Sequence, residues 1–206
     1  GIEAVRDTIE FCREIGIGYL TLYTFSRENW NRPPSEIRAL MGLLERHLRN
    51  ELLKLLKNGI RFKAIGSLWE LPMSTQKIIK EVEEKTKGNS EMTLNIAISY
   101  GGRAEIVDAV KRVALGVKKG SINIDDITEE FFARHLYTAG CPDPDLLIRT
   151  SGEKRISNFL LWQMAYTEIY VTDVLWPDFT RQHLIEALLN FQDRERRFGL
   201  TGDQLK

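Results

Sequence analysis

The stretch IGYLTLYTF, from Ile17 to Phe25, is an almost uninterrupted run of apolar and aromatic residues. A run of this kind is typical of a β-strand that is buried on both faces, as the strands of parallel sheets are. Just before it, apolar side chains recur at helical spacing from Ile2 to Ile15, which predicts an amphipathic helix that ends near Gly16. The chain therefore begins with a helix followed by a buried strand.

The same alternation of helices and short apolar strands continues along the chain. The longest predicted helix follows Pro33 and Pro34, runs from Glu36 to Asn58 and ends before Gly59, since proline favours helix starts and glycine favours helix ends. Further strands are predicted at residues 60–66, 93–99, 145–149 and 168–173, and further helices at residues 74–87, 103–119, 128–137 and 180–197. This order predicts an α/β fold with a mainly parallel central sheet flanked by helices on both faces.

The length and the even composition of the chain predict one domain. The 206 residues, of which 43% are hydrophobic, are enough for one substantial core. No low-complexity linker or repeat divides them, so a single catalytic domain spanning residues 1–206 is expected. Because the pattern opens on a helix, we expect a first strand and the loop that follows it to be missing in front of Gly1.

Composition and charge argue against several classes of function. Lys and Arg total 29 and Asp and Glu total 29, so the formal charge is zero, which weighs against nucleic-acid binding. Cys12 and Cys141 are too few for a disulfide framework, which predicts a reduced, cytoplasmic protein. The three histidines lie far apart, and neither a zinc-type spacing, a signal peptide nor an apolar run of transmembrane length is present.

Polar residues are concentrated where three of the predicted strands end. SRENWNR (26–32) follows the first strand, YGGR (100–103) follows the strand at 93–99, and RTSG (149–152) ends the strand at 145–149. In open parallel sheets ligands bind outside the carboxyl ends of the strands, so these segments are expected to surround one cleft. Arginine side chains bind phosphate oxygens through paired hydrogen bonds, and hydroxyl groups and backbone amides beside glycine can bind the remaining oxygens. The pattern predicts a phosphorylated substrate.

Each of these segments also has a simpler explanation. RTSGEKR (149–155) is what a solvated turn looks like, ENWNRPP (28–34) leads into the long helix, and Trp30 is a candidate core residue. Neither nucleotide-binding motif, GxGxxG or GxxxxGK[ST], is present. Asp125 and Asp126 precede a predicted helix and do not form the DDxxD repeat of helical prenyl-transfer enzymes. The residues alone indicate an anion site and leave its substrate open.

Four longer blocks of sequence resemble the cis-prenyltransferases. They are LTLYTFSRENWNRP (20–33), LNIAISYGGRAEIVDAV (94–110), DLLIRTSGEKRISNFLLWQMAYTEIYVTDVLWPDF (145–179) and RERRFG (194–199). The resemblance implies a homodimeric α/β enzyme with a hydrophobic tunnel, which condenses isopentenyl diphosphate repeatedly onto an allylic diphosphate such as farnesyl diphosphate and requires Mg²⁺. Each addition would create a cis double bond, and the product would be a long-chain polyprenyl diphosphate such as undecaprenyl diphosphate. Its release would involve peripheral contact with a membrane.

The resemblance also implies roles for individual residues. Asn29 matches the asparagine with a catalytic role in proton transfer, and Glu168 matches the magnesium-binding glutamate. The helix from Glu36 to Asn58 would form a wall of the tunnel. Arg197 and Gly199 match an Arg-x-Gly ending that reaches the partner subunit's isopentenyl site. Matches to the isopentenyl diphosphate site are Arg149, Arg155, Ile156 and Ser157, and matches to other substrate contacts are Ser26, Arg27, Glu28, Trp30 and Arg32.

One part of the family pattern has no counterpart in the 206 residues. The family's loop for the allylic diphosphate, an Asp-Gly-Asn-Gly-Arg-Trp-Ala type of sequence with a metal-binding aspartate, is absent, and we expect it to belong to the missing first strand. The alternatives are a non-catalytic dimer partner of a cis-prenyltransferase and a generic phosphate-ester binding module. Retention of Asn29, Arg149 and Glu168 favours the enzyme, because a pure partner has no need of diphosphate ligands.

Overall fold

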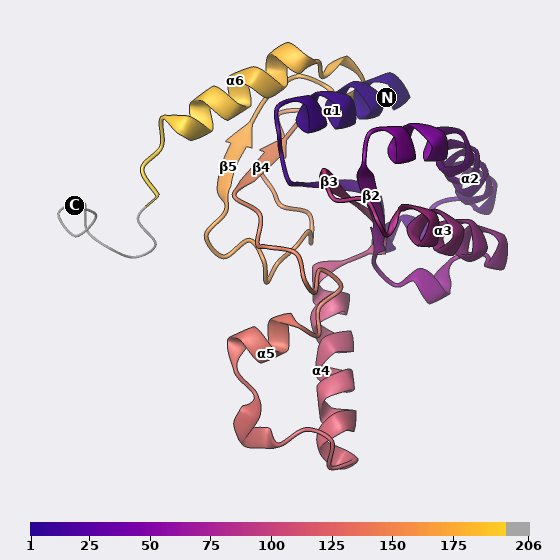
Figure 1. The fold of residues 1–206 in the computed structure, drawn as a ribbon, viewed down its shortest axis with the longest axis vertical. Helices are drawn as coiled ribbons and strands as arrows, with labels where there is room; N and C mark the ends of the chain where they lie inside the picture. The colour runs from indigo at the N-terminus through magenta and orange to yellow at the C-terminus, as the bar shows by residue number, and fades with distance from the viewer. Residues whose placement is uncertain (197–206) are drawn as a thin grey trace. The chain divides into compact units, whose positions relative to one another are not determined.

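The computed structural model describes residues 1–196, which form two compact units. The first, here called the sheet unit, contains Cys12–Pro142 and Asn158–Leu160. The second, the C-terminal unit, contains Gly1–Phe11, Asp143–Ser157 and the described residues from Leu161 to Arg196. Figure 1 shows the course of the chain through both. Among the described residues, no helix combines the length and the apolar character that crossing a membrane requires.

The sheet unit is built on three parallel strands in the order β1-β3-β2. They are β1 (Tyr19–Ser26), β2 (Ile60–Ile65) and β3 (Met92–Tyr100). The central strand β3 is paired on both sides and buried along nearly its whole length, as its continuous apolar sequence predicts. Ser26 at the end of β1 pairs with Tyr100 at the end of β3, so the two strands end at the same edge of the sheet.

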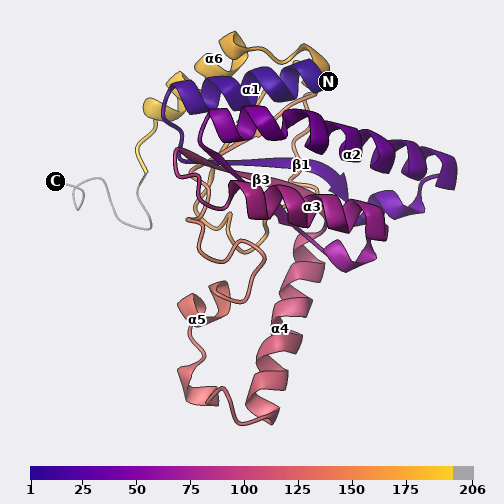
Figure 2. The same cartoon turned by 45° about the vertical axis from the view of Figure 1, so that its right-hand side comes forward.

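Two helices connect these strands and cover the sheet. Helix α2 (Pro34–Lys57) joins β1 to β2, and α3 (Met73–Thr86) joins β2 to β3. The two helices pack against β2 and against each other, side by side along the sheet in Figure 2. Buried residues of α2 recur every seven positions, at Met41, Leu48 and Leu55, which marks the helix face that packs inward.

Helix α4 (Gly102–Lys118) begins directly after β3 and extends away from the sheet beside α5 (Glu129–Ala133) (Figure 1). The Thr128 hydroxyl accepts a hydrogen bond from the Phe131 amide at 3.1 Å, which confirms the predicted cap. The prediction that this helix reaches Tyr137 is wrong. The Tyr137 amide donates to the Glu105 carboxylate at 2.7 Å, and its hydroxyl donates to Asp108 at 2.6 Å, so tertiary partners replace the helical ones.

The C-terminal unit contains a parallel pair of strands and one helix packed against it. The strands are β4 (Leu146–Arg149) and β5 (Glu168–Val171), and the helix is α6 (Arg181–Gln192), which contacts β5. Helix α1 (Ile2–Glu14) contributes Asp7, whose carboxylate binds the Arg181 guanidinium at 2.5 Å. The expected helix to residue 197 is therefore too long, because Arg194 instead hydrogen-bonds Glu168 and Asn190. Within residues 1–196 every strand pair is parallel, as predicted, but the strands form two separate sheets.

Candidate functional site

Backbone strain marks the segments in which the functional residues were predicted. A positive φ is rare for residues other than glycine and costs on the order of 1–3 kcal/mol, and it clusters at functional sites. In the described chain five such residues occur, at the end of β3, just after β4 and in the segment 157–160. They are Ser99, Ser151, Ser157, Asn158 and Leu160, with φ between 43° and 67°. Ser99 and Ser151 therefore mark two of the three polar strand ends, and Ser157 is itself one of the predicted site residues.

The first group of predicted residues lies on one short turn after β1. This turn is the 3-10 helix η1 (Arg27–Asn31). The Ser26 amide donates to Asn29 Oδ1 at 2.9 Å, which folds the turn back onto the strand. Because the amide oxygen of Asn29 is the acceptor, its NH₂ group is the end that can donate to a substrate. The structure thus brings Ser26, Arg27, Glu28, Asn29 and Trp30 together at the carboxyl edge of the sheet.

Trp30 and Arg27 are held in place by residues from two other strand ends. Trp30 Nε1 donates to the Ser99 hydroxyl at 2.8 Å, and its ring meets Phe25 edge-on. Arg27 donates through Nε and Nη2 to one oxygen of Glu70, at 3.0 and 2.6 Å. This contact is the main reason that the pKa of Arg27 is raised above its ordinary value. Trp30 is half-buried, so it is not a fully buried core residue.

Glu28 is bound by Asn158, which also closes the start of α4. Asn158 Nδ2 donates to Glu28 Oε1 at 2.8 Å. The backbone and side-chain oxygens of Asn158 accept from the amides of Gly102 and Arg103, at 2.7 and 2.9 Å. A Cβ atom on Gly101 would lie 2.9 Å from Asn158 Nδ2, so a side chain at this position would displace the amide group that donates to Glu28. Partial burial raises the pKa of Glu28, but hydrogen bonds from its backbone amide, Asn158 and Ser26 outweigh burial and lower it.

Arg32 lies outside this group of hydrogen bonds. Its guanidinium pairs with Glu36 on the first turn of α2 at 2.9 Å, and both side chains are about half exposed. Only its backbone amide joins the turn, by donating to the Asn29 carbonyl at 3.0 Å. A substrate contact by Arg32 therefore stays a prediction, since its charge is already engaged on α2.

In the C-terminal unit, the end of β4 presents an arginine with an unsatisfied donor. Arg149 Nε is buried, and no hydrogen-bond acceptor for it is found within residues 1–196. Beyond it, the Ser151 and Gly152 amides donate to the Val174 and Thr172 carbonyls, both at 2.9 Å, and so hold the turn after β4. A buried charged donor without a partner is costly, and a bound anion would remove that cost. Arg149 is therefore suited to a phosphate ligand.

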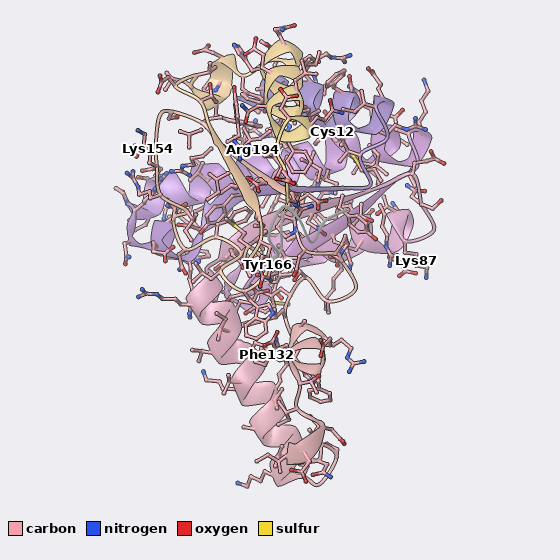
Figure 3. All side chains as sticks on the ribbon, turned by 90° about the vertical axis from the view of Figure 1, so that its left-hand side faces the viewer. Cys12, Lys87, Phe132, Lys154, Tyr166 and Arg194 are labelled. Atoms are coloured by element: carbon pink, nitrogen blue, oxygen red, sulfur yellow. The ribbon has the colours of Figure 1, made fainter. Side chains whose placement is uncertain are left out.

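The loop after this turn carries the other residues matched to the isopentenyl site. Arg155 is 67% exposed and pairs with Glu153, and Ile156 is exposed as well. Ser157 is half-buried and adopts a φ of 51°. Lys154, labelled in Figure 3, also projects into solvent. The loop thus holds exposed cations next to a half-buried hydroxyl, which is a chemistry that suits a diphosphate.

Glu168 lies at the opposite end of the β4–β5 pair from Arg149. It pairs with Leu146, whereas Arg149 pairs with Val171, a separation of three residue steps or on the order of 10 Å. Glu168 Oε2 accepts a hydrogen bond at 2.8 Å from Nη1 of Arg194, which lies just after α6. Residues 1–196 contain no group of three or more metal-ligating side chains. One carboxylate fits Mg²⁺ when phosphate oxygens and water supply the other ligands.

The sequence reasoning missed three residues that organise the site: Glu70, Ser99 and Asn158. Glu70 follows β2, so the rule that selected the other polar strand ends would have found it. Ser99 is hidden within an apolar strand, and only its positive φ of 48° sets it apart. Of the predicted residues, Arg197 and Gly199 lie outside the described part of the chain.

Comparison with known proteins adds a consistent set of similarities. Residues 1–199 match the family model for undecaprenyl diphosphate synthase. The isoprenyl transferase of Geobacter sulfurreducens is 50% identical over 205 residues, which are 100% of this chain and 83% of that protein. The isoprenyl transferase of Chlorobaculum tepidum is 52% identical over 206 residues, 100% of this chain and 78% of that protein. A crystal structure of lavandulyl diphosphate synthase from Lavandula x intermedia with dimethylallyl diphosphate has a TM-score of 0.92 at 38% identity, over 96% of this chain and 86% of that one.

Proposed function

Because the chain belongs to the undecaprenyl diphosphate synthase family and is an isoprenyl transferase, we propose that it elongates an allylic diphosphate by repeated addition of isopentenyl diphosphate. The observation that carries the proposal is the buried Arg149 Nε, which has no acceptor in the described chain and lies at a strand end. Farnesyl diphosphate is the proposed primer, and a cis-polyprenyl diphosphate of undecaprenyl length is the proposed product.

We propose that isopentenyl diphosphate binds to the C-terminal unit. Arg149 and Arg155 supply charged donors, and the Ser157 hydroxyl supplies a neutral one. Ile156, exposed in the same loop, offers apolar surface to the hydrocarbon part of the substrate. Each charge-assisted hydrogen bond of this kind is worth roughly 1.5–3 kcal/mol, so one bond from each arginine contributes roughly 3–6 kcal/mol of the about 8 kcal/mol that micromolar binding requires. Arg197 and Gly199 are proposed to reach the same substrate in the partner subunit.

The chemical step needs charge stabilisation at the leaving group. The allylic C–O bond breaks and the diphosphate departs with the electron pair, the isopentenyl double bond then forms the new C–C bond, and a proton leaves to create the cis double bond. Asn29 is proposed as the catalytic residue for this proton loss. A carboxamide does not accept a proton at neutral pH, so Asn29 would act by donating a hydrogen bond that positions the proton acceptor, for example an oxygen of the released diphosphate.

Magnesium is the proposed cofactor. Glu168 would hold Mg²⁺ together with the phosphate oxygens of the substrate, after Arg194 has released its carboxylate. When bound, the ion neutralises negative charge that develops on the leaving diphosphate. Ser26, Arg27 and Glu28 are proposed to orient the substrate at the carboxyl edge of β1.

A growing prenyl chain requires an apolar enclosure, and α2 is the proposed wall. Each addition brings five carbons, and burial is worth about 0.8 kcal/mol per CH₂, so every cycle increases retention by about 4 kcal/mol. This gain explains how a product stays bound through many additions, and why peripheral contact with a membrane is proposed for its release. The exposed Tyr166, Ile169 and Leu175 of the C-terminal unit support a proposed homodimer interface.

The test is incorporation of radiolabelled isopentenyl diphosphate with farnesyl diphosphate and Mg²⁺, followed by separation of products by length. In a protein that also carries the family's allylic-diphosphate loop, we expect a ladder that ends in long products, loss of incorporation after chelation of Mg²⁺, and strong loss in Arg149→Ala. A protein that binds isopentenyl diphosphate without elongating it would instead support the non-catalytic partner. Failure to bind either diphosphate would refute the proposal.

A further inference from the structure

We propose that Glu70 and Ser99 are positioning residues that fix Trp30 and Arg27 for the substrate; the inference rests on the proposed function and extends it to two residues of the sheet unit. A continuous path of hydrogen bonds carries it. Trp30 Nε1 donates to Ser99 Oγ at 2.8 Å, and Ser99 Oγ donates to Glu70 Oε2 at 2.6 Å. The other carboxylate oxygen, Oε1, accepts both contacts from Arg27. Glu70 therefore connects Arg27, the first residue of η1, with Trp30 near its end.

The two positioning residues are themselves fixed by a close approach of two strand ends. The Ser67 amide donates to the Ser99 carbonyl at 3.0 Å. A Cβ atom on Gly66 would lie only 2.0 Å from the Ile98 carbonyl oxygen, so a side chain is excluded where β2 ends. Ser99 is fully buried and has a φ of 48°, a conformation that the neighbouring backbone must stabilise. The strained backbone of Ser99 is explained if it places the hydroxyl group where it can accept from Trp30 and donate to Glu70.

The path limits what Trp30 can do for a substrate. Indole has a single N–H donor, and in Trp30 Ser99 uses it. Trp30 therefore meets the substrate with its ring, which suits the isoprenoid hydrocarbon and not the diphosphate. Ser99 sets the ring orientation, because its hydroxyl must accept from the indole and donate to Glu70 at once.

The path also defines the role of Arg27. Two of the five N–H groups of its guanidinium are bound to Glu70, and three are left for another acceptor. Glu70 largely cancels the net charge of Arg27, so the arginine contributes to phosphate binding mainly through oriented N–H groups and less through its charge. Removing Glu70 would leave the charge of Arg27 unneutralised, but it would also remove the contacts that hold the guanidinium in one orientation. The expected result is weaker catalysis, since small misplacements of binding groups lower rates strongly.

The experiment uses three variants of the full chain. Glu70→Gln keeps the shape and removes one acceptor, and Ser99→Ala breaks the path in its middle. Glu81→Gln is the matched control, because it makes the same change in an exposed ion pair with Lys85 on α3. Each variant is assayed for kcat and KM with both diphosphates and for thermal unfolding. The ¹H–¹⁵N resonance of the Trp30 indole, assigned with Trp30→Phe, reports the path directly.

We expect kcat/KM to fall about tenfold or more in Glu70→Gln, as loss of a charge-assisted hydrogen bond predicts, with a shifted Trp30 resonance and little change in the unfolding temperature. Glu81→Gln should match the wild type in all three measurements. An unchanged Trp30 resonance, or a kcat/KM within about twofold of the wild type, would overturn the inference. Tighter substrate binding in Glu70→Gln would also overturn it, because Glu70 would then only compete for Arg27. If the wild type elongates nothing, the proposed function fails, whereas the indole resonance still tests the path.

Discussion

Replacing Arg149 by methionine should make the free protein more stable and the substrate complex weaker. The physical reason is that Arg149 Nε is buried without an acceptor in the described residues. An unsatisfied buried donor costs about 1–3 kcal/mol. The side chain is only half-buried and its methylene groups also contribute packing, so we take the low end of that range. Arg149→Met should therefore raise the free energy of unfolding by roughly 1 kcal/mol.

The same substitution should weaken isopentenyl diphosphate binding by about 1.5–3 kcal/mol, which is roughly ten- to a hundredfold in Kd. Urea denaturation of the free protein and calorimetric titration with isopentenyl diphosphate measure the two quantities separately. Arg112→Met is the control, because Arg112 donates to the His135 carbonyl and lies over the Tyr137 ring. That arginine is satisfied, so its loss should lower stability and leave binding unchanged. A less stable Arg149→Met protein, or one with wild-type affinity, would refute the reasoning.

Three further predictions follow from individual contacts. Gly101→Ala should lower the free energy of unfolding by about 1–3 kcal/mol, because the new Cβ meets Asn158 Nδ2 at 2.9 Å. In a double-mutant cycle with Asn158→Ala, the two losses of stability should be less than additive, and additive losses would show that the two residues do not interact. The pKa of Glu28 is lowered on folding, so its contribution to stability is complete above the ordinary value of 4.5 and is lost as the pH falls through the lower folded value. The difference in unfolding free energy between wild type and Glu28→Gln should shrink over that range, and a pH-independent difference would count against it. Light scattering should show a homodimer that Ile169→Asp dissociates, and a monomeric wild type would exclude the proposed interface.

Local signals explain why most of the fold could be predicted. Pro34 begins α2, and Gly59, with a φ of 66°, follows its end, as proline and glycine rules predict. The end of α6 could not be predicted, because Arg194 leaves the helical path for Glu168, a residue 26 positions away. The division of the strands into two ladders depends on pairing between distant segments and has no local signal.

In the candidate site, too, features with a local sequence signal could be predicted and features that depend on distant segments could not. The expectation that ligands bind beyond the carboxyl ends of parallel strands singled out Ser26 to Trp30, and these residues do share one place in the fold, because β1 is followed at once by the turn η1. It could not show that Arg32 would be engaged by Glu36, since that depends on how α2 begins. The role of Asn158 could not be predicted either. It depends on a backbone conformation with a φ of 59° and on a side chain that accepts from the first turn of α4, which is distant in the sequence.

The hydrogen bond from Asn158 to Glu28 joins residues 130 positions apart, and it has a consequence for biosynthesis. A ribosome makes the chain from its N-terminus, so β1, β3 and α4 all emerge before Asn158 exists. Until then the first amides of α4 lack the acceptors that Asn158 supplies, and Glu28 lacks its partner. Contacts of such long sequence separation form late and slowly. A nascent chain can thus complete these hydrogen bonds only after most of it has been translated, so the arrangement around Glu28 and the start of α4 belongs to the last stage of folding.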